Sequence, residues 1–219
     1  GRDVRREELQ QELEVALVQV EKTGLALRSQ RENIADHLSE CITRELVDIG
    51  FEHGFFDVQI NPCEPGPSGM DEIEFGFAPN AGETMRPLRM IASSGEISRV
   101  MLATKAVLAK QDQIPVLVFD EIDANVGGEI GGAVGRKLAQ VAEHHQLICI
   151  THLPQVAACG TTHLAVSKKV EDGRTYTEVE LLDVDTRPDE IARMLGGKDS
   201  TNVTMQHAKE MLEQTTLGF

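Results

Sequence analysis

Two adjacent carboxylates, Asp120 and Glu121, stand at the end of a short apolar run and are well placed to do chemistry. The run, Pro115 to Phe119, has the continuous apolar character of a strand buried on both faces, as in a parallel sheet. A carboxylate directly after such a strand suits a nucleotide-bound Mg²⁺, which it holds through water, and a second one can polarise an attacking water. The alternative is that both residues simply begin a solvated loop.

A histidine, His152, follows a second apolar run, Leu147 to Ile150. A glycine-rich turn and a helix from about Gly128 separate the two runs, and strand, helix and strand in this order predict a βαβ unit with parallel strands. Because parallel strands finish at the same edge of a sheet, we expect His152 to lie near Asp120 and Glu121. A histidine there can reach a terminal phosphate, although a structural role is as common.

A third segment, Ser93 to Glu96, precedes a helix that the apolar spacing predicts from Ile97 to about Lys110. A serine hydroxyl and a run of backbone N–H groups would then lie at the positive end of a helix, where anions bind. Ordinary helix capping explains the same residues without any ligand.

A long helix is predicted from Glu7 to Ile49, where there is no proline and only one glycine, Gly24. Apolar residues recur at spacings of three, four or seven along it, as in a coiled coil. We expect its first half to pack on a partner helix; the alternative is a helix folded back on its own domain.

Alternating apolar residues and turn residues predict the remaining elements. Strands at 55–60 and 73–77 fit an antiparallel pair and are followed by a loop at 80–89. Strands at 164–167 and 175–181 fit a hairpin that turns at Glu171–Arg174. A helix capped by Thr186 ends at Gly196, and a last helix runs from about Thr201 to Gln214.

Composition excludes several classes of protein. The formal net charge is −15 and the sequence pI is about 4.8, which argues against the chain itself binding nucleic-acid backbones or anionic membranes. The four cysteines, with no CxxC motif, indicate free thiols in a cytoplasmic protein. The chain starts directly in a charged helical pattern, without an initiator methionine or an apolar leader, and is expected to be a fragment of a longer protein.

Three motifs together resemble the ATPase head of the RecN family, bacterial DNA-repair relatives of the structural-maintenance-of-chromosomes (SMC) proteins. They are Ile91–Arg99, Val116–Gly128 and Ile150–Ala158, and their order and spacing are specific to ABC-type ATPases. The resemblance covers most of the chain. It implies an α/β fold: the C-terminal part of an ABC-type P-loop NTPase head, with a parallel sheet, helices and a small antiparallel part, joined to a long N-terminal coiled-coil helix.

The resemblance also implies roles for individual residues. Asp120 would be the Walker B carboxylate that holds Mg²⁺ through water, and Glu121 the general base for ATP hydrolysis. Ser93, Ser94, Gly95 and Glu96 would form the signature motif, which contacts the γ-phosphate of ATP bound on an opposing head. Asp123 to Gly127 would be a loop that crosses the interface between two heads, and His152 the switch histidine.

Two departures from the family pattern matter. Ser94 stands where the family usually has the first of two glycines, which adds a side chain where backbone approaches phosphate. No GxxxxGK[ST] phosphate-binding loop (Walker A) occurs anywhere in the sequence, so this chain alone is predicted to hydrolyse little ATP.

The resemblance supplies the missing loop from an N-terminal half of the same protein. Residues 1–50 would be the coiled-coil helix that returns to this half, and residues 51–219 the C-terminal lobe of the head. A second head would complete a homodimer, and DNA would be engaged by the full protein at the nucleoid in double-strand break repair and recombination, with no membrane involved.

The sequence leaves three other interpretations of its function open. Asp120, Glu121 and Asp123 resemble the acidic cluster of a magnesium-dependent nuclease. Cys149, His152, Cys159 and His163 have the residue types of a zinc site, although Cys149 lies inside an apolar strand. The acidic surface and the long helix would also suit a non-hydrolytic assembly module.

Overall fold

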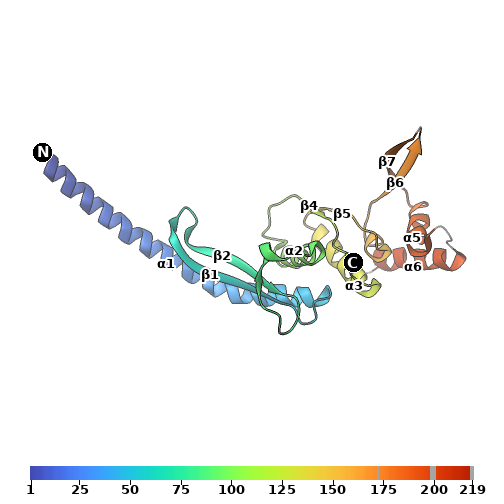
Figure 1. Ribbon diagram of the computed structural model, residues 1–219, viewed down its shortest axis with the longest axis horizontal. Coiled ribbons are helices and arrows are strands. Elements are labelled where there is room, and N and C mark those ends of the chain that lie inside the picture. The colour runs from blue at the N-terminus through green and yellow to red at the C-terminus, as the bar shows by residue number, and fades with distance from the viewer. Residues whose placement is uncertain (172, 198–200, 218–219) are drawn as a thin grey trace. The chain divides into compact units, whose positions relative to one another are not determined.

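The computed structural model describes residues 1–171, 173–197 and 201–217, and its elements group into two compact units (Figure 1). The first unit contains residues 1–44 and 53–91, and the second contains residues 45–52 and the chain from Ala92 onward. Asp172 of the predicted hairpin turn, and residues 198–200 and 218–219 of the predicted C-terminal lobe, lie outside the described residues. The predicted boundary after residue 50 therefore remains a prediction about functional lobes, because the compact units divide within the first helix.

The first unit is built on helix α1, Arg2–Asp48, which confirms the predicted long helix. Its N-terminal half carries apolar side chains that are exposed to solvent, among them Leu9, Leu13 and Val20. An exposed apolar stripe with this spacing is what a coiled-coil partner would cover, and the pairing itself remains a prediction.

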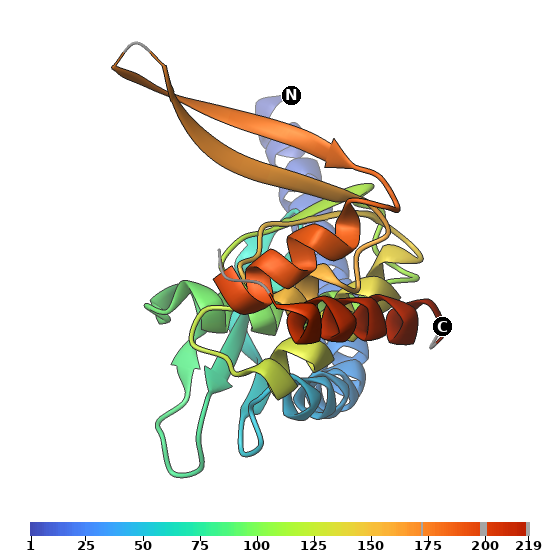
Figure 2. The same ribbon diagram turned by 90° about the vertical axis from the view of Figure 1, so that its right-hand side faces the viewer.

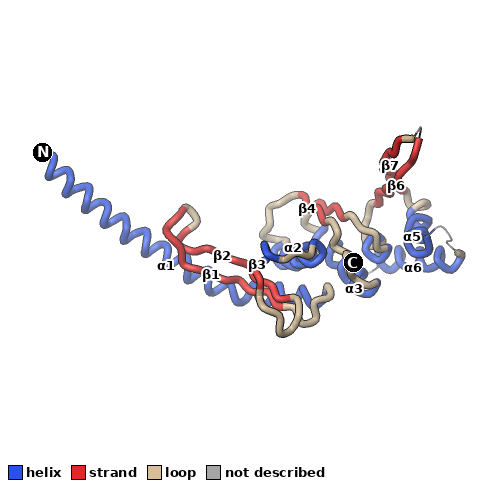
Figure 3. The backbone as a smooth tube through the Cα atoms, in the orientation of Figure 1, coloured by secondary structure: helices blue, strands red, loops and turns tan. Residues whose placement is uncertain are grey.

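Strands β1, Phe55–Gly66, and β2, Gly69–Ala78, form the predicted antiparallel pair (red in Figure 3). Phe56 pairs with Phe77 and Ile60 with Ile73. The strands are longer than predicted, because pairing continues through the proline-rich segment after a shift in register beyond Pro62. The loop predicted at 80–89 contains a short third strand, β3, Arg86–Pro87, and the 3₁₀ helix η1, Leu88–Met90, follows.

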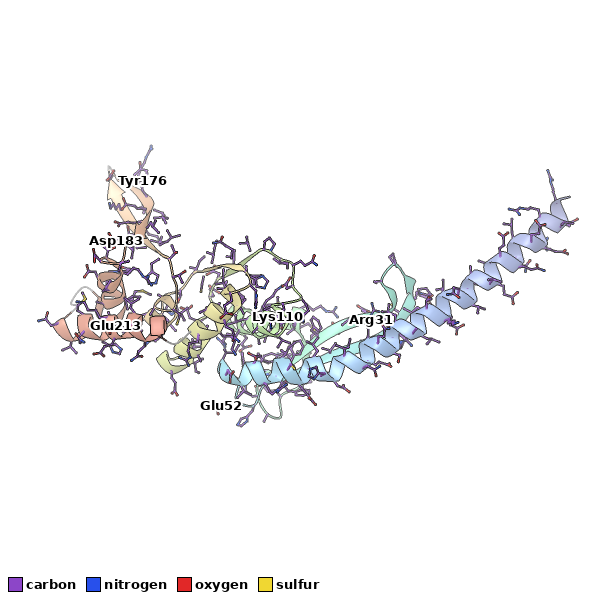
Figure 4. The ribbon with its side chains drawn as sticks, turned by 180° about the vertical axis from the view of Figure 1, so that it is seen from behind. Arg31, Glu52, Lys110, Tyr176, Asp183 and Glu213 are labelled. Carbon is purple, nitrogen blue, oxygen red and sulfur yellow. The ribbon has the colours of Figure 1, made fainter. Side chains whose placement is uncertain are left out.

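A buried carboxylate ties the end of this hairpin to α1. Asp71 accepts hydrogen bonds from Nε of Arg28 at 2.5 Å and from Nη1 of Arg31 at 3.0 Å. Figure 4 shows Arg31 on α1 beside the strand pair. The hydrogen bond from Arg28 holds the pKa of Asp71 below its usual value against the opposing effect of burial, and Arg31 adds to the lowering.

The second unit contains the predicted βαβ arrangement. Strand β4, Val116–Phe119, helix α3, Gly128–Ala142, and strand β5, Gln146–Cys149, follow one another, and the two strands pair in parallel. Helix α2, Ser94–Leu108, precedes β4 and packs on α3. The parallel pairing confirms the sequence-based prediction, with β5 beginning one residue early.

The prediction that this sheet is buried on both faces is wrong for the chain by itself. Leu117 and Phe119 are buried, whereas Val118 is 63% exposed and Ile150 just beyond β5 is 58% exposed. The described sheet has two strands, and only the face that carries Leu117 and Phe119 is packed. Strands that are apolar on both faces but covered on one leave an apolar surface open.

The rest of the second unit begins with the short helix α4, Pro154–Ala157, which sequence analysis missed. Strands β6, His163–Glu171, and β7, Arg174–Leu182, form the predicted hairpin, which extends away from the C-terminal helices in Figure 2. Those helices are α5, Arg187–Gly196, and α6, Asn202–Leu217. They pack around Ile191, Ala192 and Ala208.

The prediction that the Thr186 side chain caps α5 is wrong. Its hydroxyl makes no capping hydrogen bond and instead donates to Oδ1 of Asp183 at 2.8 Å. No helix in the described part of the chain is both long enough and apolar enough to cross a membrane.

Candidate functional site

The parallel pairing of β4 and β5 places their carboxyl ends at one edge of the sheet. The register pairs Phe119 with Cys149, and the N–H of Ile150 donates to the carbonyl of Phe119 at 2.9 Å. Asp120 and Glu121 therefore leave β4 where Thr151 and His152 leave β5. The carboxylate of Asp120 is exposed and makes no hydrogen bond to any other residue that the structure describes, so its oxygens are available to a hard cation.

Glu121 is held in an unusual backbone conformation and its carboxylate has a specific partner. Its φ is 56°, in the left-handed region that side chains other than glycine rarely adopt. The hydroxyl of Ser94 donates a hydrogen bond to Oε2 of Glu121. Sequence analysis predicted both residues for the site but predicted no contact between them.

The N-terminus of α2 has the predicted capping geometry. Ser93 is the N-cap, and its hydroxyl accepts a hydrogen bond from the N–H of Glu96 at 3.3 Å. Gly95 is buried, and a Cβ at this position would meet the carbonyl oxygens of Glu121 and Ala124 at 3.2 Å. A residue larger than glycine would therefore push the loop after β4 away from α2.

Two residues further along α2 hold the same loop and were not predicted as site residues. Ser98 donates to the carbonyl oxygen of Asp120 at 3.0 Å. The buried Arg99 donates from Nη1 to the carbonyls of Ile122 at 3.4 Å and Ala124 at 3.2 Å. Its guanidinium lies 4.8 Å from the ring centroid of Phe51, a cation–π contact. The signature segment and residues 120–124 are thus fixed to one another.

Asp123 lies inside the protein, where it holds the segment after β5. Its side chain is 1% exposed, and Oδ2 accepts hydrogen bonds from the hydroxyl of Thr151 and from the N–H groups of His152 at 2.9 Å and Leu153 at 3.1 Å. Burial alone would raise the pKa of Asp123, but these donors and the nearby imidazole of His152 keep it below its usual value.

His152 combines a fixed backbone with an accessible ring. Nδ1 lies 3.2 Å from Oδ2 of Asp123, while the side chain is 73% exposed. Asp123 therefore orients the imidazole, and the ring remains open to a ligand from solvent. Thr151 completes this arrangement and was not predicted as a site residue.

The loop predicted to cross a dimer interface runs from Asp123 to Gly127. Asn125 is exposed and has a φ of 60°, in the left-handed region. Gly127 is the exposed N-cap of α3, and a Cβ there would meet nothing within 4 Å. Asn125 and Gly127 are thus the exposed residues of this loop, Val126 is half-buried, and Asp123 points inward.

The two metal alternatives do not fit this geometry. Among residues 1–171, 173–197 and 201–217, no group of three or more His, Cys, Asp and Glu side chains could hold a metal ion. The zinc site proposed at Cys149, His152, Cys159 and His163 is therefore wrong. Burial raises the pKa of the Cys149 thiol to about 12, with smaller contributions from Asp123 and Asp120. The nuclease-type cluster fails because Asp123 is committed to Thr151, His152 and Leu153.

The fold is that of SMC heads. The Smc head domain with a coiled coil and joint from Pyrococcus yayanosii aligns with 98% of this chain and 36% of its own, with a TM-score of 0.58 and 17% identity. The Smc head domain with an extended coiled coil from Pyrococcus furiosus aligns with 71% of this chain and 37% of its own, with a TM-score of 0.51 and 20% identity. These likenesses confirm the predicted fold class.

The chain matches no protein-family model, but it matches curated proteins over nearly its whole length. The DNA repair protein RecN of Halalkalibacterium halodurans is 38% identical over 220 residues, 98% of this chain. RecN of Bacillus subtilis is 35% identical over 230 residues, and RecN of Deinococcus radiodurans is 38% identical over 205 residues. The chain spans 39%, 40% and 36% of the lengths of these three relatives. This chain is thus similar over almost every residue to RecN proteins, of whose length it spans about two fifths, and it has the fold of an SMC head.

Proposed function

We propose that this chain forms the C-terminal part of an SMC-type ATPase head, in which ATP is bound and hydrolysed between two engaged heads. The observation that carries the proposal is the edge of the β4–β5 sheet, where Asp120, Glu121 and His152 follow two parallel strands. The N-terminus of α2, with Ser93 and Ser94, is fixed to the same loop.

The residues at this edge fit Mg²⁺ and a nucleotide phosphate. Mg²⁺ takes oxygen ligands and keeps several waters, so one exposed carboxylate, Asp120, is sufficient on the protein side when phosphates complete the shell. When bound, the ion would neutralise negative charge on the phosphates. Serine hydroxyls and backbone N–H groups at the start of a helix suit the phosphate itself.

The other residues have separate tasks in this proposal. Glu121 accepts a proton from the attacking water and orients that water toward the terminal phosphate. His152 donates a hydrogen bond to the phosphate, and Asp123 fixes the orientation of its ring from behind. Ser93 and Ser94 contact the γ-phosphate held by the opposing head, and the segment from Asn125 to Gly127 meets that head.

A phosphate-binding loop has to come from another part of the protein, since no GxxxxGK[ST] occurs in this chain. We propose that the N-terminal half of the same protein supplies it and that α1 leads back from the coiled coil. Hydrolysis would separate two heads of a homodimer and couple the nucleotide state to the engagement of broken DNA ends. With a net charge of −15, this chain leaves DNA contacts to other parts of the protein, at the nucleoid within the cytoplasm.

Magnesium-dependent ATP hydrolysis by the full-length protein tests the proposal. We expect Glu121→Gln to reduce turnover at least about 100-fold, as loss of a general base does, and Asp120→Asn to weaken it as well. Glu129→Gln, which removes an exposed carboxylate from the first turn of α3, is the matched control and should retain turnover. Unchanged hydrolysis in Glu121→Gln would instead show that this chain supplies no general base, and would support an assembly role for it. Stimulation by linear DNA with free ends tests the link to repair.

A further inference from the structure

The hydrogen bond between Ser94 and Glu121 requires a side chain at position 94, where the signature pattern that this chain resembles usually has a glycine. Ser94 is the first residue of α2, and its hydroxyl donates to Oε2 of Glu121. A glycine at this position, as the pattern usually has, could not make the bond. Both side chains are exposed, so the bond can be broken by a ligand that arrives from solvent.

The backbones that carry the two side chains are held together independently of this bond. Gly95 packs against the carbonyl of Glu121, and Ser98 donates to the carbonyl of Asp120. Arg99 fixes the next turn of the loop through Ile122 and Ala124. Breaking the hydroxyl–carboxylate bond would therefore free the Glu121 side chain without moving the loop.

The hydroxyl of Ser94 can serve only one acceptor at a time, because it carries a single proton. In this structure the acceptor is the Glu121 carboxylate, which lies beside the first turn of α2, where a negative charge is stabilised. A phosphate that bound at the same helix end would compete for the same proton, and it would also repel the Glu121 carboxylate. The side chain of Glu121 thus occupies the place that the proposed function gives to the γ-phosphate of the opposing head.

Resting on that proposed function, we propose that Ser94 is a positioning residue that withholds the general base Glu121 until a nucleotide phosphate on the opposing head takes over its hydroxyl. Ser94 serves the nucleotide of the partner head, whereas Glu121 serves the nucleotide of its own head. The bond therefore links the two composite sites of a dimer: nucleotide arriving at one site releases the base that acts at the other.

A double-mutant cycle on nucleotide-driven head association tests this link without turnover. The full-length protein is titrated with a non-hydrolysable ATP analogue and Mg²⁺, and association is followed by light scattering. In the Ser94 background, Glu121→Ala frees the hydroxyl and should lower the half-saturating analogue concentration. In the Ser94→Gly background there is no hydroxyl to free, so the same change should have an effect about 3- to 10-fold smaller. Equal effects of Glu121→Ala in both backgrounds would overturn the proposal.

Steady-state hydrolysis supplies a second readout. Ser94→Gly and Ser94→Ala should lower the Hill coefficient for ATP toward one, and Ser94→Thr, which keeps a hydroxyl, should restore the wild-type value. Ser167→Ala is the matched control: it removes an exposed hydroxyl from β6, a strand that carries no residue of the proposed site, and should leave the Hill coefficient as in the wild type. Thermal melting establishes that every variant is folded.

The outcomes separate this inference from the function on which it rests. A wild-type protein that does not hydrolyse ATP, or a Glu121→Gln variant that hydrolyses it normally, removes the proposed function. Normal wild-type hydrolysis with a dead Glu121→Gln variant, but a Hill coefficient unaffected by Ser94→Gly, removes the inference alone. A Ser94→Thr variant that behaves like Ser94→Ala also removes it, since a hydroxyl would then not be the active feature.

Discussion

At the scale of single residues, Asp123 shows how a buried carboxylate can position a site without touching a ligand. One of its oxygens accepts hydrogen bonds from Thr151 and from two backbone N–H groups, which joins the loop after β4 to the loop after β5. Replacing one partner leaves buried donors unsatisfied, and this costs more than the net contribution of the bonds themselves.

We expect Asp123→Asn to lower the free energy of unfolding by about 1–3 kcal/mol, because a neutral amide oxygen accepts these hydrogen bonds more weakly than the charged carboxylate does. Chemical denaturation of the variant and the wild type at pH 7 measures the difference. Glu129→Gln, at an exposed carboxylate, provides the reference and should change stability by less than about 0.5 kcal/mol. An Asp123→Asn variant as stable as that reference would show that the contacts of Asp123 contribute nothing.

The Asp123 carboxylate also makes a pH-dependent contribution to the free energy of unfolding. Since the pKa of Asp123 in the folded state lies below its ordinary value of 3.8, its contribution to stability is complete above that value and is lost as the pH falls through the folded-state pKa. The difference in unfolding free energy between the wild type and Asp123→Asn should therefore be retained at about pH 5 and shrink below about pH 4. A difference that grew as the pH fell below about 4 would have the wrong sign.

Cysteine chemistry gives a further test at this scale. With a pKa of about 12, Cys149 is almost entirely a thiol at neutral pH, and thiols are poor nucleophiles. Cys63 is exposed on β1. In the native protein at pH 8, iodoacetamide should alkylate Cys63 well before Cys149, as followed by peptide mass spectrometry over time. Unfolding in urea should remove the difference, and equal rates in the native protein would refute the assignment.

At the scale of elements, glycines on α3 decide how closely the segment around α4 can approach. A Cβ on Gly135 would meet Sγ of Cys159 at 2.7 Å and the carbonyl oxygen of Gln155 at 3.0 Å. A Cβ on Gly132, less than one turn away, would meet only the end of the Arg136 side chain at 3.4 Å. The two positions share a helix but differ in what lies against them.

This difference predicts opposite effects of the same substitution. Gly135→Ala forces backbone atoms apart and should destabilise the protein by about 1–3 kcal/mol. Gly132→Ala meets a flexible side chain and should stabilise it by about 0.4–1 kcal/mol, since alanine loses less backbone entropy in a helix. Thermal unfolding of the two variants side by side makes the comparison, and a shift of the same sign in both would contradict the packing of α3.

Local patterns predicted those elements whose signal is contained in a few neighbouring residues. The apolar runs before Asp120 and His152 and the helix between them gave the βαβ unit, and the parallel order then placed the site residues at one edge. The short helix α4 was missed because four residues carry too little periodicity. The bond from Ser94 to Glu121 and the inward direction of Asp123 could not be predicted, because each is a tertiary contact between segments.

At the scale of the whole molecule, one apolar face of strands β4 and β5 is left uncovered by the residues that the structure describes. The sequence has apolar residues on both faces of these strands, whereas the structure packs one face and leaves Val118 and Ile150 exposed. The chain spans 39% of the length of a RecN relative, so the rest of such a protein is available to cover the open face. An apolar face of this kind is a docking surface or an aggregation hazard.

A charge placed on the open face should therefore affect the stability of this chain alone and of the full-length protein differently. Val118→Glu in this chain alone should change its stability by less than about 0.5 kcal/mol, because the side chain is already in water. In the full-length protein the same change would bury a carboxylate without a partner, and we expect it to lower stability by several kcal/mol or to prevent assembly of the head. Val184→Glu, at a position that is 80% exposed, is the matched control and should be tolerated in both. Denaturation curves of the three proteins in both lengths make the measurement, and a full-length protein indifferent to Val118→Glu would show that this face of the sheet remains uncovered.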